Sequence, residues 1–304
     1  MRISTTDSFF SINKSAGDPA VTALAWRYGN ALARRWHRSY AALPADADAD
    51  SVAELTMALD AAEGLGVSDA ALRGQLTAAV RRFSARAFLG FDPRRGSPPQ
   101  VVVSLTHEDA CMAAGIPIPA DPARCPTLRR TLPDYNLWYD ALITTYFGDR
   151  FGVAHGASFA QLMRWRSGLQ PYPDRRQLGE DAFYDLVYLI THLVYTHNGY
   201  GQRPSDPVAM APELAYLRGS FQQVIDDDDP ETYAEYVDTL RSFGLSATDE
   251  PRIGWAMARL MALQNPDGSW GDPGERDVYS RYHSTWTAVD ALREYRWERR
   301  EPRR

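Results

Sequence analysis

The second half of the chain, from residue 134 onward, is a series of helix-length segments joined by short turns. Apolar residues recur at helical spacing over stretches of about 12–18 residues, with Gly, Asp and Pro at their boundaries. Gly199 and Gly244 stand where helix C-caps belong, and Asp229 followed by Pro230 is a typical helix start. The predicted helices span 134–148, 156–167, 180–197, 211–225, 231–243, 250–263 and 280–297. This rhythm predicts a mostly α protein.

The first 130 residues combine helical patterns with an irregular, proline-rich segment at 90–130. Only residues 100–105 in that segment, QVVVSL, resemble a strand, and the sequence offers it no obvious partner. No long flexible linker separates the two parts. We therefore predict a helical N-terminal region, 1–130, packed on a helical domain, 131–304.

Composition argues against several classes of protein. A net charge of −6 without a basic stripe does not favour nucleic-acid binding. No apolar run approaches membrane-spanning length, and the N-terminus lacks a signal-peptide core, so we expect a cytoplasmic protein. Cys111 and Cys125 are too few for a disulfide framework and fit no zinc-binding spacing, so they are expected to be ordinary thiols. The oligomeric state is not predicted.

The sequence QNPDGSWG, residues 264–271, predicts a helix end and a tight turn. Gln264 ends a helix, Asp267-Gly268 forms the turn, and Trp270 can fold back over the helix terminus. The arrangement resembles the QW motif of the terpenoid-cyclase and protein-prenyltransferase superfamily, whose members are α/α toroids with inner and outer helical rings around a cavity. The resemblance implies a mostly α fold, an α/α-toroid-like array of helical hairpins with an irregular N-terminal extension. It covers residues 230–297, and 134–229 by helix-pair rhythm alone.

The following segment, RYHSTWTAVDAL at 281–292, extends this comparison to a candidate site. It resembles the Tyr-His-Thr helix start of prenyltransferase β subunits, in which the histidine binds zinc on the inner ring. The resemblance implies that His283 is a metal ligand. The Asp-x-Cys pair of those enzymes has no counterpart in this sequence. The resemblance therefore does not extend to a zinc site that activates the thiolate of a cysteine substrate. The alternative is a cavity histidine without a metal.

The segment FYDLVYLITHLVYTHNGYG, residues 183–201, predicts a helix that is buried on nearly every side. Tyr188, His192 and Tyr195 are spaced i, i+4, i+7 and share one face. His197 lies about 140° round the helix from His192, so the two can share an ion only if the helix loosens before Gly199.

Three imidazoles, from His192, His197 and His283, could form a metal site with open positions. Such an all-nitrogen site suits a transition metal ion, Fe, Cu or Zn. One or two ordinary core histidines are the alternative interpretation.

The remaining candidate residues complete a small-molecule site. Tyr188, Tyr282 and Trp286 are expected to bind an aromatic or apolar substrate, and Tyr195 is a catalytic candidate. His107, in the cluster His107-Glu108-Asp109, could act as a general base or a ligand. The sequence thus predicts a small-molecule-modifying metalloenzyme, an oxidase or oxygenase, although zinc hydrolysis would use the same ligands.

Two other classes stay open. The run Asp226–Asp229 allows a terpene cyclase, because Asp227, Asp228 and Glu231 can be drawn as an Asp-Asp-x-x-Glu motif for Mg²⁺ and a diphosphate. The same run is also explained as the solvated start of a helix. A metal-free binding or scaffold protein is the third possibility.

Overall fold

The computed structural model describes residues 100–105, 117–121, 128–152, 156–266, 269–275 and 278–293, together with 70, 74, 110–111, 114–115, 124, 295 and 297. The described residues belong to two compact units, one within 81–196 and the other consisting mainly of residues from His197 onward. Each unit is described by itself. The predicted helices before residue 89 and His107 lie outside the described residues.

A two-stranded sheet is the first element among the described residues of the unit within 81–196. Strand β1, Gln100–Ser104, pairs antiparallel with β2, Arg129–Pro133, and Val102 lies opposite Thr131. The predicted strand therefore has a partner in β2. The sequence of β2, RRTLP, is not typical of a strand, because it contains two arginines and ends in proline. The remaining elements are α6 (Tyr135–Phe151), α7 (Phe159–Met163), a 3₁₀ turn (Arg166–Leu169), α8 (Arg175–Leu178) and α9 (Glu180–Asn198), whose last two residues belong to the second unit.

Cys111, in the same unit, is disulfide-bonded, and Cys125 is the only other cysteine in the sequence. The expectation of two ordinary thiols is therefore wrong for Cys111. A count of two cysteines excludes a framework of several disulfides, but it does not exclude a single bond that closes a short loop.

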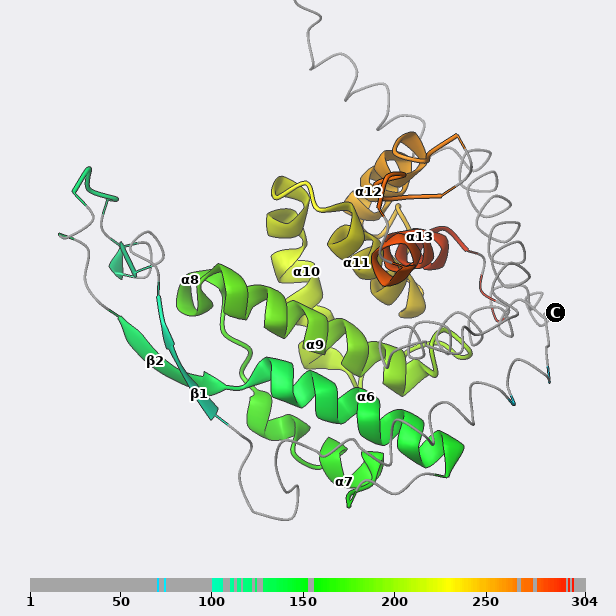
Figure 1. Ribbon diagram of the computed structural model, residues 1–304, viewed down its shortest axis with the longest axis horizontal. Coiled ribbons are helices and arrows are strands. Elements are labelled where there is room, and N and C mark those ends of the chain that lie inside the picture. Colours follow the sequence, from blue (N-terminus) through cyan, green and yellow to red (C-terminus); the bar gives the residue numbers. More distant parts are fainter. Residues whose placement is uncertain are drawn as a thin grey trace, which may run out of the picture. The chain divides into compact units, whose positions relative to one another are not determined.

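The described residues of the second unit from Ala211 onward form four helices that Figure 1 shows together: α10 (Ala211–Asp226), α11 (Pro230–Ser242), α12 (Pro251–Ala262) and α13 (Val278–Leu292). The prediction of a mostly α protein is confirmed, and most helix boundaries agree within a few residues. Helix α7 is shorter than the predicted 156–167, and α13 ends at Leu292 instead of 297. The α/α-toroid-like arrangement of the helical hairpins stays a prediction.

Helix α11 starts as its sequence predicts. Asp229 is the N-cap, its Oδ1 accepts a hydrogen bond from the Glu231 amide at 3.1 Å, and Pro230 occupies the first turn. At the other end Gly244 has φ 82°, and its amide donates to the Arg241 carbonyl at 2.8 Å.

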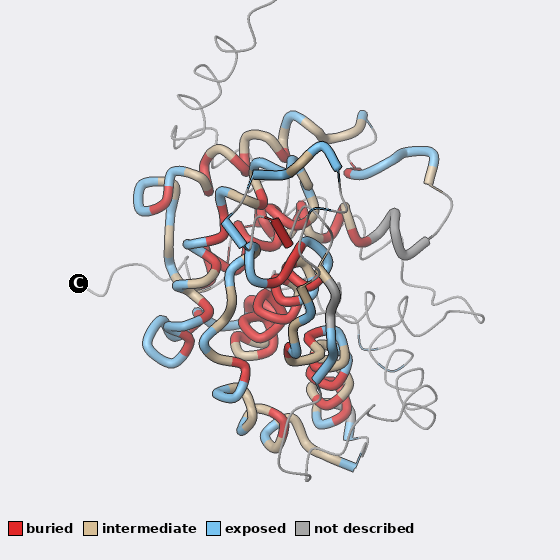
Figure 2. Tube along the Cα trace, turned by 90° about the vertical axis from the view of Figure 1, so that its left-hand side faces the viewer, coloured by how far each residue is buried: buried red, intermediate tan, exposed pale blue. Residues whose placement is uncertain are grey.

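Helix α11 is the core of its unit, because every residue from Thr232 to Ser242 is buried. It packs against α10, α12 and α13, and the buried segments are red in Figure 2. The Tyr236 ring stacks on Phe221 of α10 at 5.3 Å, and the Tyr233 ring meets Trp255 of α12 edge-on. A helix so enclosed must find partners for its polar side chains.

Many of those partners come from α13, which runs parallel to α11. Ser284 near the start of α13 donates to Glu231 near the start of α11 at 3.0 Å. At the other ends, Arg241 Nη1 donates to the Ala291 carbonyl at 2.7 Å. Two parallel helices with an intervening helix, α12, are the local pattern that an array of helical hairpins produces.

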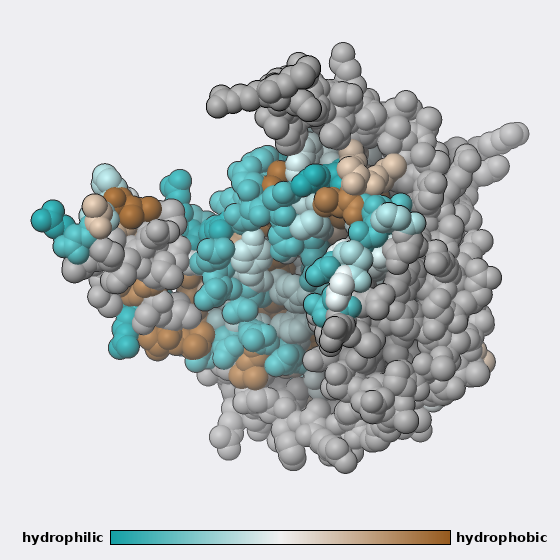
Figure 3. Space-filling view, turned by 45° about the horizontal axis from the view of Figure 1, so that its top comes forward, coloured by the Kyte–Doolittle hydropathy of each residue, from teal (hydrophilic) through white to brown (hydrophobic). Residues whose placement is uncertain are grey.

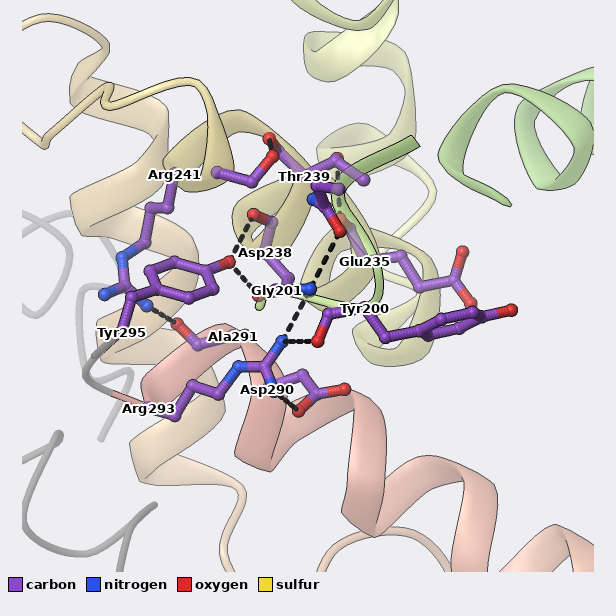
Figure 4. A network of polar contacts seen from close by, with 12 residues as sticks. Tyr200, Gly201, Glu235, Asp238, Thr239, Arg241, Asp290, Ala291, Arg293 and Tyr295 are labelled. Carbon is purple, nitrogen blue, oxygen red and sulfur yellow. Dashed lines mark hydrogen bonds and ion pairs between the residues drawn. The ribbon is translucent and has the colours of Figure 1, made fainter. Parts of the chain in front are cut away.

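A buried polar network joins the ends of α11 and α13 (Figure 4). The Tyr295 hydroxyl donates to the carbonyl oxygen of Asp238 at 2.8 Å and also to its carboxylate. Arg293 Nη2 lies 3.6 Å from Asp238 Oδ2. Burial raises the pKa of Asp238 although Arg293, Tyr295 and Arg241 oppose that shift. Because these groups are desolvated together, removing any one leaves a buried partner uncompensated.

The same network contacts the turn after α9. Arg293 Nη2 donates to the Tyr200 carbonyl at 3.4 Å, and the Gly201 amide donates to Asn198 Oδ1 at 2.8 Å. Gly201 has φ +78°, and a Cβ there would collide with the Arg293 guanidinium and the Tyr295 ring. A glycine is required at this position both for its backbone angle and for space.

On the face shown in Figure 3, the described surface is mainly hydrophilic, with hydrophobic residues in small groups. None of the helices among the described residues is both long enough and apolar enough to span a bilayer.

Replacing Gly201 by alanine tests the close packing of this turn, with Gly244→Ala as the matched control. Both glycines have a left-handed backbone, but a Cβ at Gly244 meets nothing within 4 Å. We expect Gly244→Ala to lower the free energy of unfolding by about 1 kcal/mol, the cost of the backbone angle. Gly201→Ala should lose about 1–3 kcal/mol more through overpacking. Equal losses in urea unfolding would contradict the packing described here.

Candidate functional site

The turn before α13 holds the first residues of that helix against the end of α12. Trp270 is buried, and its Nε1 donates to the Leu260 carbonyl at 2.7 Å, capping α12. The Trp270 amide donates to Thr285 Oγ1 at 3.1 Å. The prediction that Trp270 folds back over the helix terminus is confirmed, whereas Asp267-Gly268 lies outside the described residues.

His283 lies in the first half of α13, and its imidazole faces two carboxylates of α11. Its Nε2 is 2.9 Å from Glu231 Oε1 and 3.9 Å from Glu235 Oε1. Because a carboxylate can only accept, the short contact places a proton on Nε2. His283 and Glu235 are almost fully buried, whereas the Glu231 side chain is 34% exposed. The cluster therefore combines a sequestered imidazole with one carboxylate that solvent reaches.

Glu231 stays ionised because of its partners. Burial alone raises the pKa of this carboxyl. The hydrogen bond and the charge of His283, together with the hydrogen bond from Ser284, outweigh burial and hold the pKa below its ordinary value of 4.5. Ser284 Oγ donates to Oε2 at 3.0 Å, so the two oxygens of Glu231 have different donors. The pair His283–Glu231 is thus a charge-assisted hydrogen bond in a largely buried setting.

A second group of candidate residues comes together in the unit within 81–196. His192 is buried and lies against three tyrosine rings, with centroids 4.8 Å (Tyr139), 5.2 Å (Tyr188) and 5.3 Å (Tyr195) away. The prediction that Tyr188, His192 and Tyr195 share one face of a helix is therefore confirmed. Tyr139 of α6 was not predicted, since nothing in the sequence indicates that α6 packs on this face.

One ring nitrogen of His192 has a defined role. Its Nδ1 lies 2.8 Å from the Tyr188 carbonyl, which can only accept, so Nδ1 carries a proton. This bond within one helical turn fixes the ring orientation and assigns the acceptor role of the neutral ring to Nε2.

His197 and His192 could share an ion only if the helix loosened before Gly199, and the structure shows no such loosening. Helix α9 continues without interruption to Asn198, so the two side chains keep the helical separation of about 140°. Over the part of the chain that the structure describes, no three His, Cys, Asp or Glu side chains are grouped so that they could hold one ion. The three-histidine metal site therefore stays a prediction without geometric support.

Of the remaining predicted site residues, the structure describes the side chain of Trp286 but not those of Tyr282 and His107. Trp286 is buried on α13, one helical turn beyond His283. Tyr282 lies in α13, but its side chain is outside the described residues, as is His107.

Three side chains of the acidic run at 226–229 form an ion pair, a helix cap and a hydrogen bond with residues of their own unit. Asp228 forms an ion pair with Arg259 at 3.1 Å, and Asp229 caps α11. Asp226 accepts a hydrogen bond from Gln222 at 2.9 Å. These contacts fit the interpretation of the run as a helix start. Glu231, two residues after the run, instead contacts His283.

Sequence reasoning missed Glu235 as a site residue and considered Glu231 only as part of the acidic run. The available signal was the spacing Glu231, Glu235, Asp238 (i, i+4, i+7), which places three acids on one face of a helix. In an exposed helix this pattern is ordinary. It becomes informative only once α11 is known to be buried on all sides.

No family model, curated protein or solved structure matches this chain. The proposals that follow therefore depend on the geometry of the described residues.

The pH dependence of stability tests the Glu231 interaction. The folded pKa of Glu231 lies below its unfolded value of 4.5, so the stabilising contribution is complete above pH 4.5 and is lost as pH falls through the folded pKa. We expect Glu231→Gln to be less stable than the wild type at pH 6, with the difference shrinking below pH 4.5. Urea unfolding between pH 6 and 3 measures this.

The exposed Glu180 offers a matched control, since its ion pair with Arg175 at 3.7 Å lies on the surface. Glu180→Gln should show little pH-dependent difference. A Glu231→Gln difference that stays constant across the whole range would show that the carboxylate is not held ionised by its partners.

Proposed function

We propose that this chain is an enzyme that moves a proton on a small apolar molecule, with His283 and Glu231 as the acid–base pair. The observation that carries the proposal is the 2.9 Å contact between a buried imidazole and a carboxylate that is one-third exposed. A buried pair of titratable groups at the edge of solvent access is a recurrent feature of catalytic sites.

The arrangement supports proton transfer in either direction. The Nε2 proton of His283 lies between the imidazole and Glu231, and Glu235 Oε1 at 3.9 Å places a second acidic side chain beside the same nitrogen. Ser284 keeps Glu231 in place through Oε2. A substrate that reaches the exposed side of Glu231 can exchange a proton with the pair, without large side-chain movement.

Proton transfer initiates several reactions on apolar substrates, including isomerisation, elimination and cyclisation. The cyclase alternative, with Mg²⁺ and a diphosphate held by Asp227, Asp228 and Glu231, is separate from this proposal, in which Glu231 is paired with His283.

A metal-dependent version is the second candidate. Two ligands bound to one ion at about 2.0–2.2 Å and at right angles are about 2.9 Å apart, which is the His283–Glu231 separation. An Fe, Cu or Zn ion held by these two side chains would leave positions open for substrate and water. It would supply Lewis-acid or redox chemistry, as expected for the predicted oxidase or oxygenase.

Deuterium incorporation tests proton transfer without knowledge of the final product. The protein is incubated in D₂O with a panel of apolar ketones and isoprenoid diphosphates, and each compound is analysed by mass spectrometry. We expect at least one compound to gain deuterium faster with the wild type than without protein. His283→Asn and Glu231→Gln should reduce that rate about 10²–10⁴-fold, the usual contribution of a general acid or base.

His192→Asn is the control, because it removes another buried imidazole and should leave the rate within a fewfold of the wild type. Lack of incorporation across the panel, or incorporation that survives both site variants, contradicts the proposal. A rate that is lost on chelation and restored by Fe, Cu or Zn replaces it with the metal-dependent version.

A further inference from the structure

We propose that the indole N–H of Trp286 donates a hydrogen bond to an oxygen of the bound ligand, so the His283 site selects apolar molecules that carry a carbonyl-type acceptor. This inference rests on the proposed function, since it assigns a substrate class to the same site. It identifies Trp286 as a specificity-determining residue.

The starting observation is a buried donor. Trp286 is 5% exposed, and its Nε1 has no hydrogen-bond acceptor among the residues that the structure describes. Trp270, equally buried at 4%, shows the ordinary situation, because its Nε1 donates to the Leu260 carbonyl at 2.7 Å. A buried N–H without an acceptor costs free energy, so proteins keep such groups mainly where a ligand or a function needs them.

The position of Trp286 connects this donor to the acid–base pair. Trp286 follows His283 by three residues in α13, so the two side chains lie on the same side of the helix in adjacent turns. The ligand in this proposal lies on this side of α13, against Glu231, His283 and the indole.

The chemistry of the indole restricts the ligand. The N–H can only donate, which requires an acceptor such as a ketone, ester or carboxylate oxygen. The flat apolar ring beside the N–H favours a hydrophobic or aromatic body next to that oxygen. The indole also offers a donor to negative charge that develops on the oxygen when a neighbouring carbon loses a proton.

The first test measures whether the N–H already has a partner in the ligand-free protein. Trp286→Phe keeps an aromatic ring and removes the donor, and Trp270→Phe is the matched variant. We expect Trp270→Phe to shift the unfolding equilibrium about fivefold or more towards the unfolded state, because the Leu260 carbonyl loses its donor. Trp286→Phe should shift it less than Trp270→Phe. A loss of stability in Trp286→Phe as large as that in Trp270→Phe shows an acceptor within the chain and overturns the inference.

The second test compares acetophenone with ethylbenzene, which share the apolar ring and differ in the carbonyl. Binding to the wild type and both tryptophan variants is measured by ligand-observed NMR titration. We expect the wild type to prefer acetophenone about fivefold or more, Trp270→Phe to keep that preference, and Trp286→Phe to lose it. A wild type that binds neither probe or both equally, or a preference that survives in Trp286→Phe, overturns the inference.

Failure of this inference can be distinguished from failure of the proposed function. Deuterium incorporation that depends on His283 and is unchanged in Trp286→Phe keeps the acid–base centre and removes Trp286 from it. A carbonyl preference that depends on Trp286, without any deuterium incorporation, supports the binding role of Trp286 and contradicts the enzyme.

Discussion

The described part of the second unit depends on the polar contact between two parallel buried helices, α11 and α13. Helix α11 places Glu231, Glu235 and Asp238 along one face, with Glu235 and Asp238 buried and Glu231 partly exposed, and unpaired buried carboxylates are costly. Helix α13 and the residues after it supply His283 for the first two acids and Arg293 for the third. The packing of the two helices and the candidate chemistry therefore follow from one requirement, that each buried acid has a cationic or hydrogen-bonding partner.

Much of the helical architecture could be predicted from local signals. Asp229-Pro230, Gly244 and Trp270 take the capping roles that their residue types favour, because these interactions involve neighbours in sequence. The partner of strand β1 could not be predicted, since pairing with 129–133 depends on a distant segment with no strand-like composition. The disulfide of Cys111 could not be predicted either, because the number of cysteines in a sequence does not show whether a disulfide forms.

The candidate site was predicted in part. The shared face of Tyr188, His192 and Tyr195 was predicted from their spacing, and the structure confirms it. His283 was chosen through the resemblance of its helix start, and the structure places it against two carboxylates, while its role as a metal ligand stays a prediction. The association of His192 with His197 stays a prediction, because α9 remains helical through both residues and does not loosen between them. Glu235 was missed for another reason. A glutamate in a predicted helix is normally exposed, and only the packing of three other helices around α11 makes it a buried partner of His283.

The coupling between His283 and Glu231 tests the central claim most directly. A double-mutant cycle with His283→Asn, Glu231→Gln and the combined variant, measured by urea unfolding at pH 6, isolates the pairwise energy. The account predicts a coupling of about 1–2 kcal/mol, in the range of a charge-assisted hydrogen bond with one partly exposed partner. Losses that add to within about 0.5 kcal/mol would show that the two side chains are independent and would contradict the account.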